Sequence, residues 1–293
     1  MPQRIELRER KSHSLRWPGP AAMVLALLLA GCNPDSGTTV PEGVPPDGAR
    51  PDANPSGSVE SVARATAAAG GARAVEEENE LYSFHYSYPG AAGRIPALAA
   101  LLDARLDADR AELTAQTAQA QKDAQAEGFP WRPYDRSTAW AVVADLPDWL
   151  SMSADLYQYS GGAHGMSTFD SLLWDKRKGA PLAPLALFSS AEALEAAIKP
   201  QFCTLLDRQR AAKRGAEESR AGGGLFDECI TLASTTVILG SSNRRTFDRI
   251  GFLIPPYEAG PYVEGTYEVT LPVTARILAA VRPEYRESFT APR

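Results

Sequence analysis

The chain has 293 residues, of which 44% are hydrophobic and 23% are charged, and it carries a formal net charge of −6 at pH 7. This length allows one large or two small domains. The acidic balance argues against a nucleic-acid-binding protein, which would present clustered Lys and Arg, and three histidines are too few for a His-rich metal site.

The N-terminus has the pattern of a secretory signal. Five basic residues precede a short apolar segment, 21–30, whose end overlaps the sequence Leu29-Ala30-Gly31-Cys32. Ten apolar residues cannot cross about 30 Å of hydrocarbon, so residues 1–31 are predicted to be a signal peptide and not a spanning helix. The Leu-Ala-Gly-Cys ending resembles the bacterial lipobox. This resemblance implies that Cys32 becomes the lipidated first residue of a lipoprotein.

The expected lipid anchor predicts a location and a charge for the mature chain. Several acyl chains hold a protein firmly to a membrane. Asn33, and not Asp, follows Cys32, which favours the outer membrane, facing the periplasm, in a Gram-negative host. Removal of residues 1–31 leaves 25 Lys and Arg against 34 Asp and Glu, a net charge of −9. This acidity fits either a basic partner or plain solubility.

The next segment, residues 32–79, is predicted to be a disordered linker. It contains no aromatic residue and is dominated by Pro, Gly, Ala, Ser and Asp. Such a composition cannot bury enough apolar surface to offset the entropy lost on folding. A folded domain is therefore expected over residues 80–293.

The first elements of that domain are a strand and a long helix. Residues 81–88 alternate, with Tyr82, Phe84, Tyr86 and Tyr88 on one face, and an aromatic row of this kind is interpreted as core and not as a sugar platform. Residues 96–127 predict a helix with a leucine stripe in its first half. Its second half offers only Ala at the stripe positions, so it either packs on a flat surface or projects into solvent.

The remaining elements follow in irregular order. Strands are expected at 137–146, 149–159, 166–174, 229–239, 247–254 and 266–273, with a second long helix starting after Ser190 and a short helix ending near Val281. Arg208, Arg210, Lys213 and Arg214, at the end of the second long helix, are interpreted as complements of the helix dipole on a solvated face. The predicted fold class is α+β, with a largely antiparallel sheet of five to six strands packed with two long helices.

Two glycine-containing motifs stand out in this pattern. The first is Tyr159-Ser-Gly-Gly-Ala-His-Gly165, which places His164 on a tight connection between two strands, and the second is Tyr257-Glu-Ala-Gly-Pro-Tyr-Val-Glu-Gly265. As an ordered pair they resemble a cell-envelope domain of unassigned activity. That domain occurs in the extracellular part of a lysozyme-sensing anti-sigma factor and beside the catalytic domain of a peptidoglycan deacetylase. The resemblance covers roughly residues 80–273.

The resemblance implies a noncatalytic recognition module for cell-wall glycan or a lysozyme-like protein. The expected binding residues are those of the two motifs: Tyr159, Gly161, Gly162, His164, Tyr257, Glu258 and Tyr262. The alternative is a cell-wall hydrolase in which His164 is the general base and Glu258 an acid or orienting group. No nearby residue pattern completes a reaction site, and no cofactor or metal is expected.

Two further cysteines remain after Cys32. Cys203 and Cys229 are expected to form a disulfide, because an exported protein folds in an oxidising compartment. The bridge would join the second long helix to the strand that follows it.

Overall fold

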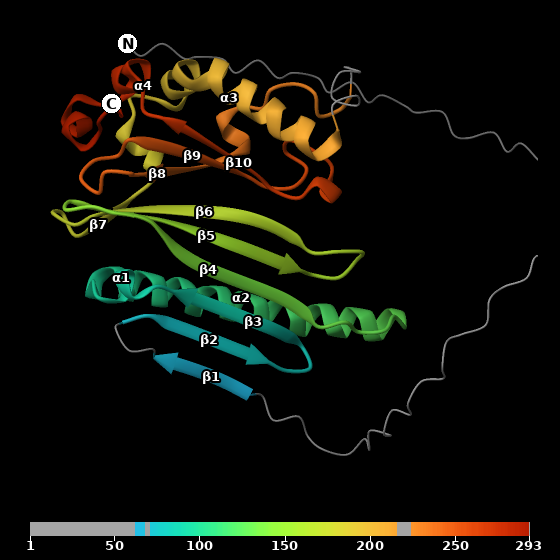
Figure 1. Ribbon diagram of the computed structural model, residues 1–293. Helices are drawn as coiled ribbons and strands as arrows, with labels where there is room; N and C mark the ends of the chain where they lie inside the picture. The colour runs from blue at the N-terminus through green and yellow to red at the C-terminus, as the bar shows by residue number, and fades with distance from the viewer. Residues whose placement is uncertain (1–61, 68–70, 216–223, 293) are drawn as a thin grey trace, which may run out of the picture. The chain divides into compact units, whose positions relative to one another are not determined.

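The computed structural model describes residues 62–67, 71–215 and 224–292, and for residues 62–67 it describes the backbone alone. Two sheets and two long helices are the main elements of these segments, which confirms the α+β class (Figure 1). The strands are β1 (Val62–Ala67), β2 (Arg73–Glu78), β3 (Tyr82–Tyr88), β4 (Tyr134–Asp145), β5 (Trp149–Tyr159), β6 (Met166–Asp175), β7 (Ala180–Leu182), β8 (Thr236–Gly240), β9 (Arg249–Ile254) and β10 (Tyr267–Pro272). The α-helices are α1 (Gly90–Gly93), α2 (Pro96–Glu127), α3 (Ala191–Arg214) and α4 (Ala275–Ala280). The short 3₁₀ helices are η1 (Pro184–Leu187), η3 (Leu232–Ser234), η4 (Tyr262–Glu264) and η5 (Pro283–Ser288).

The larger sheet contains strands β1 to β7 in chain order. Every neighbouring pair is antiparallel except β3 and β4, which pair in parallel. The exception follows from the connection, because α2 lies between these two strands in the chain and a parallel pair needs such a crossover. The β5–β6 hairpin places the first glycine motif at one end of this sheet.

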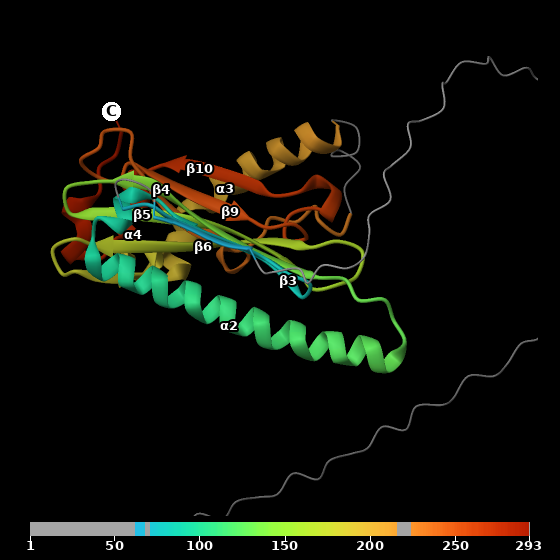
Figure 2. The ribbon, with the colours of Figure 1, turned by 90° about the horizontal axis from the view of Figure 1, so that it is seen from below.

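Helix α2 covers one face of the larger sheet. Its stripe of Leu98, Leu102, Leu106 and Leu113 is buried against the aromatic row of β3, so the interpretation of that row as core is confirmed. The helix has the predicted bounds and ends at Gly128, whose positive φ of 76° closes it. Beyond Thr117 none of its residues is buried, and Figure 2 shows this end of α2 extending past the strands.

The smaller sheet has the order β10-β9-β8 and lies on the other face of β4 to β6 (Figure 1). The Thr236 hydroxyl donates to the carbonyl of Phe169 (3.1 Å), which ties β8 to β6. Helix α3 covers the smaller sheet and starts as predicted, with the Ser190 hydroxyl accepting from the Ala193 amide. None of the helices in the described segments is both long and apolar enough to cross a membrane.

The structure corrects two expectations about strands. They are divided between a seven-stranded and a three-stranded sheet, whereas one sheet of five to six was expected. In addition, β1 and β2 lie inside the stretch 32–79 that was predicted to be linker. In β2 only Val75 is buried, so no alternation signals the strand. It is held by its ladder to β3 and by an ion pair between Glu77 and Arg110 (2.8 Å).

Candidate functional site

The β5–β6 turn requires glycine at three positions for two different reasons. Gly161 and Gly162 have φ values of 93° and 87°, which side chains rarely tolerate, although a Cβ would meet no other atom there. Gly165 is needed for space, because a Cβ would clash with the hydroxyl of Tyr157, which lies over it. Tyr159, at the end of β5, donates from its hydroxyl to the Gly162 carbonyl (3.3 Å). The turn is therefore preformed.

His164 lies in an exposed aromatic cluster with the second motif. Its ring stacks on Tyr262, with centroids 3.7 Å apart and planes 18° apart. Its Nδ1 lies 2.9 Å from the Gly165 carbonyl, and its Nε2 lies 3.3 Å from the Tyr257 hydroxyl. A carbonyl only accepts, so Nδ1 is the donor to Gly165. Both ring nitrogens are engaged.

The second motif forms a loop, residues 255–266, whose conformation is strained at one point. Tyr257 has a positive φ of 71°, which is costly for a non-glycine residue, and its amide donates to the Gly260 carbonyl (3.0 Å). The side chain of Tyr257 is 46% exposed and that of Val263 is 90% exposed. The loop therefore presents large side chains to solvent from a defined backbone.

Three basic residues of α3 hold this loop in place. Arg210, which is 3% exposed, donates from Nε to the Ala259 carbonyl (2.9 Å). Arg214 pairs through two nitrogens with the Glu264 carboxylate, at 2.7 and 3.2 Å. Lys213 donates to the Glu264 and Thr266 carbonyls. The interpretation of this basic cluster as a solvated face is wrong for Arg210, which is buried, and for Arg214, which is half-buried; Lys213 is exposed and binds the loop as well.

The groups around Glu264 favour the ionised form of its carboxylate. Burial raises the pKa of Glu264, but hydrogen bonds from Arg214 and the Tyr267 hydroxyl outweigh it, so the pKa is lowered overall. Burial and the adjacent Glu264 raise the pKa of Tyr267 to about 12, so its hydroxyl stays protonated and remains a donor at neutral pH. The carboxylate thus joins α3 to the start of β10.

The structure brings together some of the expected site residues and not others. His164, Tyr257 and Tyr262 are in contact, and Tyr159, Gly161 and Gly162 form the adjoining turn. Glu258 is exposed, and within the described segments its carboxylate makes no hydrogen bond or ion pair, with His164 or any other residue. Among the residues that the structure describes, no group of three or more His, Cys, Asp and Glu could hold a metal ion.

Sequence reasoning missed the anchoring roles of Arg210, Lys213 and Arg214. Their spacing of three and four residues would place them on one side of a helix, which was the available signal. It could not identify the loop as their partner, because Arg210 and Ala259 are separated by 49 residues in the chain.

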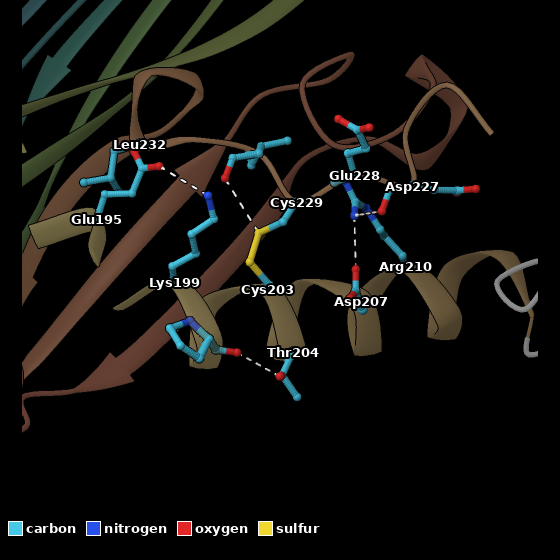
Figure 3. Close-up of a disulfide and its surroundings, with 12 residues drawn as sticks. Glu195, Lys199, Cys203, Thr204, Asp207, Arg210, Asp227, Glu228, Cys229 and Leu232 are labelled. Carbon is cyan, nitrogen blue, oxygen red and sulfur yellow. Dashed lines mark hydrogen bonds and ion pairs between the residues drawn. A yellow bond between two sulfur atoms is a disulfide. The ribbon is translucent and has the colours of Figure 1, made fainter. Parts of the chain in front are cut away.

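The expected disulfide between Cys203 and Cys229 is confirmed, with Cα atoms 5.4 Å apart (Figure 3). It fastens the segment before β8 to α3. The same segment is held by Arg210, which donates to the Glu228 carbonyl (3.0 Å), and by Glu195, which accepts from the Leu232 amide (3.1 Å). These contacts explain why residues 229–235 do not continue the expected strand, which begins only at Thr236.

The comparisons with known proteins reach part of the chain. Residues 75–167 match the family model described as Deacetylase PdaC, a span from β2 through the first glycine motif. No curated protein matches the chain. A solved DUF3298 family protein from Pseudomonas aeruginosa PAO1 is 16% identical, with 80% of this chain and 96% of that chain covered and a TM-score of 0.41. A DUF3298 family member from Bacteroides fragilis NCTC 9343 is also 16% identical, with 73% and 89% covered and a TM-score of 0.39.

The expected features of the N-terminus remain predictions. The signal peptide, residues 1–31, and the lipidation of Cys32 lie outside the described residues. The same holds for most of the expected linker, up to residue 61.

Proposed function

We propose that this protein is a noncatalytic recognition module of the bacterial cell envelope that binds cell-wall glycan through the surface formed by His164, Tyr257 and Tyr262. The preformed aromatic cluster carries the proposal, because stacked rings on a fixed backbone present binding area with little entropy left to lose. The match of residues 75–167 to a deacetylase family supports an envelope setting. An accessory role is proposed, with the chemistry belonging to other proteins or domains.

A lysozyme-like protein is the second candidate ligand. Val263 is 90% exposed beside the cluster, and an exposed aliphatic side chain next to tyrosines is more typical of a protein interface than of a sugar site. The expected charge of −9 on the mature chain would attract a basic protein.

The contacts of His164 do not favour the hydrolase alternative. A general base needs a free ring nitrogen and usually a group that orients it. Here Nε2 is in contact with the Tyr257 hydroxyl, and Nδ1 faces a backbone carbonyl; within the described segments no carboxylate contacts the ring. Replacing His164 with Ala should therefore lower the free energy of unfolding by about 1–3 kcal/mol, since two hydrogen bonds are lost.

The experiment is co-sedimentation of the purified chain with peptidoglycan sacculi, together with pull-down on lysozyme and an assay of muropeptide release. Tyr262→Ala should weaken sacculus binding by about tenfold, which is roughly 1.4 kcal/mol. Val263→Ala tests the lysozyme candidate, and Leu225→Ala, 91% exposed on another loop, is its matched control. Muropeptide release by the wild type that vanishes in a fully stable His164→Ala variant would overturn the noncatalytic assignment.

Membrane attachment is proposed to rest on Cys32. In cells fed a palmitate analogue, the wild-type chain should be labelled. The Cys32→Ser variant should carry no label and should no longer be found in the membrane fraction. Ser36→Ala, four residues further on, is the control and should keep both. An unlabelled Cys32→Ser variant that stays in the membrane fraction would contradict the lipid anchor.

A further inference from the structure

Two hollows lie between α2 and the larger sheet, and neither is lined by His164, Tyr257 or Tyr262. The inner hollow has a volume of about 260 Å³ and is lined by Glu112 and Gln116 of α2 and by Arg136 and Gln158 of the sheet, among others. The outer hollow has a volume of about 390 Å³. Its lining includes Ala120, Ala124, Phe129, Trp131, Gly161 and Gly162.

The two hollows follow one another along the same three elements. On α2 the lining passes from Gln116 to Ala120, one turn further on. Along β5 it passes from Gln158 to Ser160, which follows the last residue of the strand. On β4 it passes backwards, from Arg136 to Tyr134, which is the direction that the antiparallel register of β4 and β5 requires. We call this pair of hollows the α2 channel; it runs from Asp109 to Ala124, about 22 Å at 1.5 Å per helical residue.

The inner part of the α2 channel is polar and internally ordered. Arg136 is buried and donates to the Glu112 carboxylate and to the Gln116 amide oxygen, both at 3.1 Å. Burial raises the pKa of the nearby Asp109, against the opposing effect of Arg136. Carboxylate, amide and guanidinium groups are thus fixed side by side, and together they offer paired donors and acceptors.

The outer part of the channel is aromatic and also preorganised. Trp131 stacks on Tyr134, with centroids 5.3 Å apart, and its Nε1 donates to the Glu80 carbonyl (2.9 Å). Phe129 is 65% exposed. The small side chains of Ala120 and Ala124 leave room above these rings, and Gly161 adds bare backbone.

Mixed chemistry of this kind indicates a sugar ligand. A sugar ring has an apolar face that packs on aromatic rings and hydroxyl edges that bind planar polar groups. A helical peptide would need a more continuous apolar groove, and the carboxylates of Asp109 and Glu112 would repel phosphates. The alanines of the α2 end, which have no role in the leucine stripe, are the residues that keep the channel open.

We propose that the α2 channel binds several consecutive sugar rings of a glycan strand, with the polar end holding hydroxyl and acetamido groups and Trp131 and Phe129 packing on ring faces. This inference rests on the proposed function and names a second part of its binding site. The glycine turn joins the two parts, because Gly161 and Gly162 line the channel and His164 follows two residues later in the aromatic cluster.

The test is isothermal titration of the full chain with chitotetraose, a β-linked N-acetylglucosamine tetramer. Ala120→Trp fills the outer hollow, and Trp131→Ala removes its platform; each should weaken chitotetraose binding by at least about tenfold. Ala115→Trp is the matched control, because Ala115 is exposed on α2 and lines neither hollow. It should bind as the wild type does. Thermal unfolding of each variant confirms that a loss of binding is not a loss of fold.

The outcomes separate the channel from the proposed function. If Ala120→Trp and Trp131→Ala bind chitotetraose like the wild type while Tyr262→Ala does not, glycan binding stands and the channel assignment is overturned. The channel assignment also fails if the wild type binds sacculi but not chitotetraose. If the wild type binds neither, both the channel and glycan recognition are wrong.

Discussion

Helices α2 and α3 each cover one sheet, yet their C-terminal ends are used differently. The last turn of α2 has no basic residue, its final ten residues are not buried, and the end borders the α2 channel. The last turn of α3 carries Lys213 and Arg214, which bind the loop of residues 255–266. Positive charge at a helix C-terminus is favourable in itself, and here it also satisfies carbonyls of a distant loop. The side chains in the last turn of a helix therefore decide whether that end holds another chain segment in place or leaves an open surface.

We call the contacts of Arg210, Lys213 and Arg214 with the loop of residues 255–266 the α3 anchor. Its strongest test is Arg210→Met, which keeps the aliphatic stem and removes the guanidinium. The Glu228 carbonyl would lose its charged donor, and the Ala259 carbonyl would keep only Arg214. The free energy of unfolding should therefore fall by roughly 3–5 kcal/mol. Arg208→Met is the control, since Arg208 is exposed on the same helix, and it should stay within about 0.5 kcal/mol of the wild type in urea unfolding. Equal effects of the two changes would refute the anchor.

The disulfide should contribute nearly as much as the buried arginine. Cys203 and Cys229 are separated by 26 residues, and the chain-entropy model assigns such a closed loop about 3.5 kcal/mol. The double change to Ser should lower the unfolding midpoint accordingly. Thiol titration of the unfolded, unreduced wild-type domain, residues 62–293, should find no free thiol; two titratable groups would show that the bridge does not form in solution.

Acid should loosen the α3 anchor through Glu264. Its pKa is lowered in the folded protein, so its stabilisation is full above its ordinary value of 4.5 and is lost as the pH falls through the folded-state pKa. Glu264→Gln should cost about 2 kcal/mol at pH 7, the size of a charged hydrogen bond, and less as the pH falls below 4.5. Glu258→Gln, on the same loop, should change stability at pH 7 by under about 0.5 kcal/mol. A pH-independent deficit in Glu264→Gln would argue against ionisation as the cause.

The smallest expected effect is the difference in stability between two matched glycine substitutions, one near the end of each long helix. Ala126→Gly in α2 should cost at most about 1 kcal/mol, the intrinsic helix propensity, because the final turn supports no other segment. Ala212→Gly in α3 should cost more, since it loosens the turn that carries Lys213 and Arg214. Thermal unfolding of the two variants measures the difference. If Ala126→Gly proves the more harmful, the end of α2 has a structural partner.

Several parts of the fold could be predicted because they depend on local pattern. The leucine stripe of α2 and the alternation of Tyr82 to Tyr88 report which face is buried, whatever covers it. The Cys203–Cys229 pair could be predicted because few thiols were left to choose from. The glycine motif likewise predicted a special turn, since positive φ at Gly161 and Gly162 is a property of those residues.

The sequence by itself determined the positions of both long helices, most strands, the aromatic core and the disulfide, because each is encoded in residues close in sequence or in a nearly unique pairing. Only the tertiary structure decided the division into two sheets, the stacking of His164 on Tyr262, the use of Arg210 and Arg214 as anchors, and the opening of the α2 channel. Those features join residues far apart in the chain. A side chain's spacing shows which direction it faces, but its partner is set by how whole layers pack together.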